Sequence, residues 1–236
     1  MKVLILAGGF GSRLSEETTT KPKSMVEIGG KPIIWHIMKT YAYYGYTDFI
    51  ILIGYKGELL RQYFNAIKEH DWNVELLETG EGTLKSQRIK MAEPYIHDKN
   101  FFVSYGDDVS DISPVNVLET HLKNGKVATL TAIPLISDYG IVELNENNEV
   151  NCFREKPRID NHWINGGYFC FSKGIFNYLK NENEELEETV FRRLAAKREI
   201  GAHIHDGFWK CMNTYKDKLE LDLLITQEKA PWIKWK

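Results

Sequence analysis

Several features that would assign a chain to a specialised class are missing from these 236 residues. No apolar run approaches the roughly 20 residues that a membrane-spanning helix needs, and Val3–Ala7 is shorter than the apolar core of a secretory signal. The three cysteines, Cys152, Cys170 and Cys211, are scattered and form no C-x-x-C pair. An odd, dispersed set is typical of a reducing compartment rather than of a disulfide scaffold. We therefore expect a cytoplasmic protein that does not enter a membrane.

The chain also lacks a strong excess of charge of one sign, because its formal net charge is only −3. A nucleic-acid-binding domain normally carries a clear basic patch, so we expect no nucleic-acid partner. The sequence contains no internal repeat and no low-complexity segment that would separate domains. A chain of this length can bury one large core, and we expect a single domain.

What the chain does have is a glycine-rich stretch near its start. The apolar run Val3–Leu6 predicts a short, fully buried first strand. Three glycines follow it within four residues: Gly8, Gly9 and Gly11. Glycine lets the backbone approach a ligand closely, and successive backbone N–H groups in such a turn form an anion site. Arg13 adds a planar fork of donors for phosphate oxygens, and Lys23 adds a mobile positive charge. The stretch therefore predicts a cradle for a polyphosphate at the carboxyl end of the first strand.

Two better-known phosphate-binding patterns fit this stretch less well. The dinucleotide fingerprint G-x-G-x-x-G/A fails because Leu14 stands where the third small residue is needed, which disfavours an NAD-binding oxidoreductase. The P-loop pattern fails because Gly30–Lys31 is followed by proline and lacks the first glycine. A turn that only shapes the backbone is a further alternative, which Arg13 and Lys23 at this spacing disfavour.

A second polar cluster follows the apolar run 101–105. Gly106, Asp107 and Asp108 come directly after this predicted strand. A carboxylate at the tip of a buried parallel strand lies at the ligand-binding edge of an α/β sheet. Mg²⁺ takes oxygen ligands and commonly uses one or two carboxylates together with substrate phosphates. Asp107 is therefore a candidate Mg²⁺ ligand, and the alternative is an aspartate pair that only forms a turn.

The rest of the pattern alternates between strands and helices. Apolar runs and helical spacing predict strands over 48–55, 74–77 and 127–134, helices over 33–41 and 59–67, and a hairpin over 139–154. This order predicts a three-layer α/β/α domain with a mostly parallel, Rossmann-like sheet and a site at the strand tips.

Three other features have structural rather than chemical interpretations. The lone His36 lies on a predicted helix, and we expect it to pack or to form hydrogen bonds rather than to bind a ligand. The acidic run Glu182–Glu188 is typical of a solvated loop that leads into a helix without chemistry. Trp232 and Trp235 lie near the carboxyl terminus, where exposed aromatic residues often mark a docking surface.

The first motifs resemble the signature of the sugar-1-phosphate nucleotidyltransferases. The resemblance rests on Leu6–Leu14, Lys21–Lys23, Met25–Met38, Tyr105–Asp107 and Lys229–Trp232, and it runs over nearly the whole chain. These motifs are most like those of the cytidylyltransferase branch. The resemblance implies that the protein joins a nucleoside triphosphate, with CTP as first choice, to a sugar-1-phosphate, with glucose-1-phosphate as first choice. It further implies Mg²⁺ as cofactor, pyrophosphate as by-product, a sugar nucleotide for surface polysaccharide synthesis, and a homo-oligomer.

The same resemblance implies a role for each motif. The catalytic residues would be Arg13, Lys23 and Asp107. The nucleotide would contact Leu6, Ala7, Gly8, Gly9, Gly11, Ser12, Arg13, Lys23, Thr83, Arg88 and Gly106. The sugar phosphate would contact Gly140, Glu155, Lys156, Asn165 and Gly166. Asp107 would hold the metal, and Asn213 stands where the family has a second metal-binding aspartate. The nucleotide-binding part would cover about 1–125, the sugar-phosphate-binding part about 126–225, and a tail 226–236.

Several departures from the family pattern leave alternatives open. Asn213 offers a neutral oxygen but no charge, Asp108 replaces a small residue, and the segment 66–78 is shorter than in the cytidylyltransferases. From the residues alone, Thr83 is a plausible helix N-cap and Arg88 a solvated helix charge. The alternatives to CTP and glucose-1-phosphate are UTP, dTTP or a different phosphorylated acceptor. A protein that binds nucleotides or sugar nucleotides with little turnover is the alternative from another class.

Overall fold

The computed structural model describes residues 1–11, 14–67, 69 and 71–235. Its strands are β1 (Val3–Leu6), β2 (Glu27–Ile28), β3 (Lys31–Pro32), β4 (Asp48–Ile53), β5 (Asn73–Glu78), β6 (Asn100–Tyr105), β7 (Asp108–Ser110), β8 (Ala128–Ile136), β9 (Ile141–Leu144), β10 (Val150–Arg154), β11 (Arg158–Ser172), β12 (Ile200–Ile204) and β13 (Trp209–Cys211). Its α-helices are α1 (Ser15–Thr18), α2 (Ile33–Tyr43), α3 (Gly57–Ala66), α4 (Lys85–Met91), α5 (Pro114–Asn124), α6 (Arg192–Ala196) and α7 (Tyr215–Thr226). In this part of the chain, no helix has the length and apolar character needed to cross a membrane.

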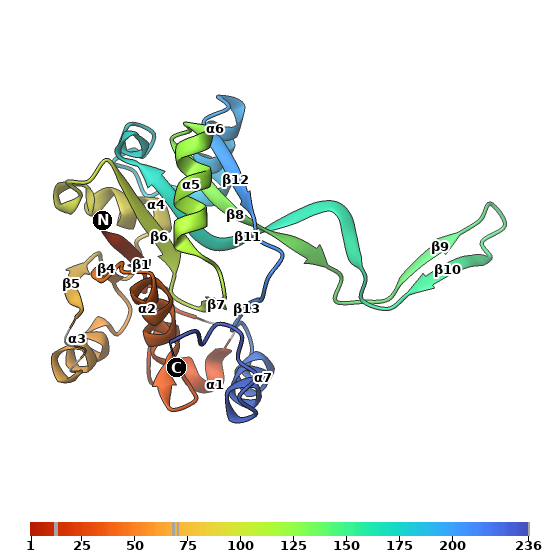
Figure 1. The fold of residues 1–236 in the computed structure, drawn as a ribbon, viewed down its shortest axis with the longest axis horizontal. Coiled ribbons are helices and arrows are strands. Elements are labelled where there is room, and N and C mark those ends of the chain that lie inside the picture. Colours follow the sequence, from red (N-terminus) through yellow and green to blue (C-terminus); the bar gives the residue numbers. More distant parts are fainter. Residues whose placement is uncertain (12–13, 68, 70, 236) are drawn as a thin grey trace.

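A seven-stranded sheet with the order β12-β8-β11-β6-β1-β4-β5 forms the centre of the fold (Figure 1). β1 pairs in parallel with β4 and β6, β4 with β5, and β8 with β12. Among the described strands of this sheet, only β11 runs antiparallel to its neighbours, β6 and β8. The mostly parallel sheet that the sequence predicts is therefore confirmed.

Both faces of this sheet are covered, because side chains alternate between the faces along each strand. On one face, Val3 and Ile5 of β1 belong to a buried cluster that also contains side chains of α2, α3, α5 and α7. On the other face, Leu4 of β1 packs in a second cluster with Ile89 of α4 and Leu194 of α6. These two cores give the predicted three layers.

The carboxyl-terminal segment is part of the first core. Trp232 is 1% exposed, and its ring stacks on Phe208 with centroids 5.2 Å apart. Its indole Nε1 donates to Nδ1 of His36 at 3.4 Å, and Nε2 of His36 lies 2.9 Å from the carbonyl oxygen of Ile28. The structural interpretation of His36 is confirmed. The expected docking surface at the terminus is wrong for Trp232, because α2 and the loop before β13 cover this ring.

A two-stranded arm projects from the sheet between β8 and β11 (Figure 1). β9 and β10 pair with each other antiparallel, and this pair is separate from the seven-stranded sheet. The predicted hairpin is confirmed. Its apolar side chains are largely in solvent, since Tyr139 is 79% exposed and Phe153 is 62% exposed.

Candidate active site

A cavity of about 620 Å³ opens at the carboxyl ends of β1 and β6. The predicted site residues that line it are Leu6, Ala7, Gly8, Gly9, Gly11, Lys23, Thr83, Arg88, Gly106, Asp107, Asn165 and Asn213. They come from segments far apart in the sequence, and the parallel strands bring these segments to one edge of the sheet. Ser12 and Arg13 lie outside the described residues.

Two glycines at the cavity, Gly11 in the predicted cradle and Gly106 after β6, have neighbours so close that a larger residue would not fit. Gly11 has a φ of +64°, and a Cβ there would lie 2.9 Å from the Cβ of Lys23. A Cβ on Gly106 would lie 2.6 Å from the carbonyl oxygen of Leu6. The turns after β1 and β6 can therefore approach each other, and Lys23 can lie against the first of them, only because these positions carry no side chain.

Arg88 supports the cradle from behind. It is 4% exposed, and its Nη2 donates to the carbonyl oxygen of Gly8 at 3.0 Å. Its Nη1 donates to the carbonyl oxygen of Ile53 at 3.3 Å and to the hydroxyl of Thr79. A Cβ on Gly8 would lie 2.1 Å from this Nη1. The alternative of a solvated helix charge is therefore wrong, because the guanidinium fixes the backbone that forms the cavity wall.

Thr83 lies in the loop before α4. Its hydroxyl donates to the carbonyl oxygen of Thr79 at 2.5 Å. The N-cap position of α4 is Leu84, which makes no side-chain capping bond. The N-cap alternative for Thr83 is wrong, and the threonine instead closes the loop that lines one side of the cavity.

Lys23, Asp107 and Asn213 meet inside the cavity. The ammonium Nζ of Lys23 lies 2.5 Å from Oδ2 of Asp107 and 3.1 Å from Oδ1 of Asn213. Lys23 is held there by a short helical turn, Lys23–Met25, and Asn213 follows β13. Two oxygen atoms predicted to bind a metal thus converge on one cation.

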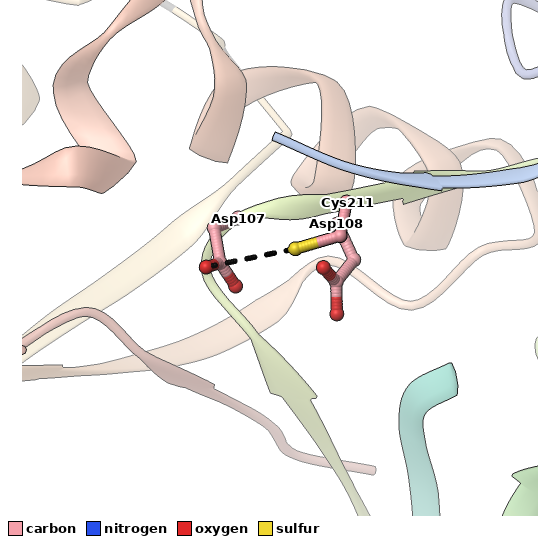
Figure 2. A group of neighbouring side chains, drawn as sticks. All are labelled: Asp107, Asp108 and Cys211. Carbon is pink, nitrogen blue, oxygen red and sulfur yellow. Dashed lines mark hydrogen bonds between the residues drawn. The ribbon is translucent and has the colours of Figure 1, made fainter. Parts of the chain in front are cut away.

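Asp108 and Cys211 lie beside Asp107 on paired strands, because Asp108 of β7 is the direct partner of Cys211 of β13 (Figure 2). Asp108 is 2% exposed, and burial together with the charge of Asp107 raises the pKa of its carboxyl well above the ordinary value. The thiol of Cys211 lies 4.0 Å from Oδ2 of Asp107. Burial, followed by the charge of Asp108, raises the pKa of this thiol.

Asn165 reaches the cavity from β11. Its Nδ2 donates to the hydroxyl of Tyr105 at 3.0 Å, and its Oδ1 accepts from the N–H of Gly167 at 3.0 Å. The β11–β8 pairing shifts register just after Asn165, and such bulges re-aim side chains near active sites. Gly166 does not line the cavity itself, but its carbonyl oxygen accepts from Nε1 of Trp209, which does.

The other predicted sugar-phosphate residues lie on the arm. Gly140 precedes β9, and a Cβ there would lie 2.6 Å from the ring of Phe153 in β10. Glu155 and Lys156 follow β10 and are exposed. The structure does not bring Gly140, Glu155 and Lys156 to the cavity of their own chain, and their role stays a prediction.

Comparison with known proteins assigns the family. The nucleotidyl transferase family model matches residues 2–228. The chain belongs to the nucleotidyltransferases. This nucleotidyltransferase is 40% identical to glucose-1-phosphate cytidylyltransferase of Salmonella typhimurium and 38% identical to the probable glucose-1-phosphate cytidylyltransferase of Bacillus subtilis, and each comparison covers both chains in full. The first alignment has 257 positions for 236 residues here, so that relative carries segments that this nucleotidyltransferase lacks.

Solved structures support the same fold. The structure of HddC from Yersinia pseudotuberculosis in complex with GMP-PN superposes with a TM-score of 0.75 at 23% identity, covering 95% of this chain and 99% of that chain. A putative glucose-1-phosphate thymidylyltransferase from Bacillus anthracis in complex with sucrose gives a TM-score of 0.71 at 18% identity, covering 100% and 97%.

Sequence reasoning missed part of the cavity of this nucleotidyltransferase. The lining residues that it did not assign are Phe10, Ser24, Glu81, Gly82, Leu84, Lys85, Tyr105, Asp108, Glu185, Trp209 and Cys211. Most of them lie next to residues that were assigned, so their position beside a motif could have identified them as cavity residues. Glu185 is different, because it lies in the acidic run that was expected to be solvated.

The acidic run in fact packs against the cavity. Oε1 of Glu187 lies 2.5 Å from Nζ of Lys85 and also accepts a hydrogen bond from the hydroxyl of Tyr105. Leu186, which is fully buried, turns one side of the segment inward. The run does lead into a helix, Leu186–Phe191, as expected, but its interpretation as solvated and without contacts is wrong for Glu185 and Glu187. Leu186, between the acidic residues, was the signal in the sequence that could have corrected this interpretation.

Asn183, at the start of the same segment, holds the loop before α4. Its Oδ1 accepts from the backbone N–H of Leu84 at 2.6 Å, and its Nδ2 donates to the carbonyl oxygen of Gly82 at 3.0 Å. One amide side chain thus pairs with a backbone donor and a backbone acceptor of the loop, as a neighbouring strand would. Gly82, Thr83 and Leu84 all line the cavity, so Asn183 fixes part of its wall.

Proposed function

We propose that this nucleotidyltransferase transfers a cytidylyl group from CTP to glucose-1-phosphate, and that it forms CDP-glucose and pyrophosphate. The observation that carries the proposal is the 40% identity to the Salmonella typhimurium enzyme over the full length of both chains. A cavity whose walls combine a glycine-rich turn, a lysine and an aspartate also fits a triphosphate and a second phosphate.

In this reaction an oxygen of the sugar phosphate attacks the α-phosphorus of CTP, and the bond from that phosphorus to pyrophosphate breaks. The attacking phosphate is already an anion, so no general base is needed. Such transfers depend on positioning and on neutralising charge. The backbone N–H groups of the turn 8–11 would hold the leaving phosphates. The ammonium of Lys23 would stabilise charge that develops in the transition state.

We infer that Asp107 and Asn213 hold a Mg²⁺ ion. Oδ2 of Asp107 and Oδ1 of Asn213 already converge on the cation of Lys23. A carboxylate and an amide oxygen, completed by substrate phosphates, match the oxygen preference of Mg²⁺, so these residues fit the ion. When bound, Mg²⁺ neutralises phosphate charge.

A substrate panel scored by pyrophosphate release tests the proposal. With glucose-1-phosphate as acceptor, we expect kcat/KM for CTP to exceed that for UTP, dTTP or GTP at least tenfold. With CTP as donor, glucose-1-phosphate should exceed other sugar phosphates similarly. Faster release of pyrophosphate with another nucleotide or another acceptor would contradict the assignment of CTP and glucose-1-phosphate as substrates. Binding of CTP with no release at any Mg²⁺ or Mn²⁺ concentration would favour a protein that only binds nucleotides.

We further propose that the protein is a homo-oligomer in which the arm docks on a second copy of the chain. An isolated two-stranded hairpin is only marginally stable in water. The arm also exposes apolar side chains, including Tyr139 and Phe153, that a subunit contact would cover. Docking on a second copy would carry Glu155 and Lys156 to the cavity of that copy, where their predicted sugar-phosphate contacts become geometrically available.

Mixing two variants tests this arrangement. Lys156→Ala and Lys23→Ala should each be inactive, but re-associated mixtures should recover part of the activity, because some cavities then combine an intact Lys23 with an intact Lys156 from another copy. A monomer by light scattering, or no recovery after mixing, would contradict the shared site. The measurement leaves the substrate proposal untouched.

We also infer a cytoplasmic location. Cys152, Cys170 and Cys211 are all free, as expected in a reducing compartment.

A further inference from the structure

One wall of the cavity holds a sulfur atom beside two carboxylates. Asp107, Asp108 and Cys211 each offer a ligand atom, and these three atoms lie within 4.8 Å of one another (Figure 2). All three residues line the cavity. We propose that they form a binding site for a thiophilic divalent cation of the Zn²⁺ type, which shares Asp107 with the site inferred for Mg²⁺ but has Asp108 and Cys211 in place of Asn213.

The carboxylate of Asp108 is the main evidence for a cation at this place. Its Oδ1 is buried and, among the described residues, has no hydrogen-bond partner. A buried polar atom without a partner is costly, and a cation is one group that satisfies it. The contacts of the Lys23 ammonium go to Asp107 and Asn213, so they do not satisfy Oδ1 of Asp108.

The backbone holds Asp108 and Cys211 in place before any cation arrives. The two residues are direct partners in the β7–β13 pairing. The hydroxyl of Tyr168 donates to the carbonyl oxygen of Asp108 at 2.7 Å. A Cβ on Gly167, at a φ of +75°, would lie 2.4 Å from Oδ2 of Asp108. The absence of that Cβ therefore leaves room for this carboxylate, and the strand pairing sets its distance from the sulfur.

The ligand chemistry selects the cation. Mg²⁺ prefers oxygen ligands in octahedral geometry, whereas a thiolate favours softer ions such as Zn²⁺. Binding replaces the thiol proton of Cys211 and, where Asp108 is protonated, its carboxyl proton, and the released protons pass to solvent. Because Asp107 belongs to both sites, a thiophilic cation bound here would withdraw Asp107 from Lys23 and from Mg²⁺. We therefore expect such a cation to inhibit nucleotidyl transfer.

Titration of the whole protein with Co²⁺ alone, without nucleotide or sugar phosphate, tests the site. A near-ultraviolet charge-transfer band from sulfur to Co²⁺ should appear in the wild type. It should disappear in Cys211→Ser and persist in Cys152→Ser, the control at a half-buried cysteine on the arm. In Asp108→Asn, the Co²⁺ affinity should fall at least about tenfold, since even outer partners of metal ligands change affinity that much. Thermal unfolding checks that each variant is folded.

Other outcomes would overturn the proposal. A Co²⁺ complex without the sulfur band would mean that oxygen atoms alone hold the cation. A band that survives Cys211→Ser, or no binding at all, would exclude the site equally. None of these results bears on pyrophosphate release with Mg²⁺, so the proposed function stands or falls separately. As a second readout, inhibition by Zn²⁺, scaled to the Mg²⁺-dependent activity of each variant, should weaken at least about tenfold in Cys211→Ser.

Discussion

Lys23 contacts several of the predicted site residues at once. Its ammonium touches both Asp107 and Asn213, while its side-chain stem lies against Gly11 of the cradle. A charge held in advance at the point where phosphates exchange stabilises the transition state more than the ground state. We therefore expect the chemistry of the site to depend strongly on this side chain.

Lys23→Ala should lower kcat by at least ~10²-fold, which is the scale for losing one preorganised charged donor. Stopped assays of pyrophosphate release measure it. The control is Lys39→Ala, which removes a lysine of α2 that pairs with Glu69 outside the cavity. Turnover near the wild-type value in Lys23→Ala would refute the assignment.

Asn213 is one of the positions at which the sequence departs from the pattern expected of the family. Asn213→Asp should lower the Mg²⁺ concentration needed for half of full activity, because a second carboxylate binds Mg²⁺ more strongly than an amide oxygen. A Mg²⁺ titration of initial rates measures the change. If the midpoint does not move, another acid already fills this role, and Asp108 is the nearest candidate.

At the scale of the element, apolar runs predict the central strands well. β1, β4 and β6 each contain a run of consecutive apolar residues, and such a run can be recognised without knowing what it pairs with. The π-helical segment Leu186–Phe191 could not be predicted in this way. Its acidic residues look solvated in the sequence, and their partners, Lys85 and Tyr105, are distant along the chain.

The same limit applies inside the candidate site. The cradle and Asp107 follow strands and obey motif spacing, so the sequence is enough to find them. Arg88 is identified by its family position, but its support of Gly8 depends on a tertiary contact. Asn183 carries no motif at all, because its role comes only from the backbone groups that the fold places beside it.

Asn183→Ala should raise the KM for the nucleotide roughly five- to tenfold, while kcat changes less. Two hydrogen bonds to the loop before α4 are lost, each with a net value of about 1 kcal/mol. Steady-state kinetics separates the two constants. Asn181→Ala is the matched control, because Asn181 is exposed on the neighbouring turn. Equal changes in both variants would show that the loop does not depend on Asn183.

At the scale of the molecule, the carboxyl-terminal segment locks onto α2 through His36 and Trp232. Burial lowers the pKa of His36 from 6.5 to about 4. The unfolded chain therefore takes up the proton first as the pH falls. This contribution to stability is complete above pH 6.5 and is lost progressively down to about pH 4. A difference of this size corresponds to roughly 3 kcal/mol.

His36→Gln should remove this part of the pH dependence. Glutamine can still donate to the carbonyl oxygen of Ile28 and accept from Trp232, but it does not titrate. Denaturant unfolding between pH 7 and 4 should show the free energy of the variant falling less steeply than that of the wild type. The control is His162→Gln, at an exposed position on β11. Parallel curves for His36→Gln and wild type would contradict the assignment.

β11 is one continuous strand from the base of the arm, through Asn165 in the cavity wall, to the middle of the sheet. A contact at the tip of the arm therefore reaches Asn165, at the end of the cavity where we propose that the acceptor lies, through β10, the residues 155–157 and then β11, which changes register on both sides of the stretch 163–165. A fluorescent dye near position 147, remote from the chemistry, should brighten or dim when that end of the cavity fills. We therefore expect occupancy of the cavity to be detectable at the tip of the arm.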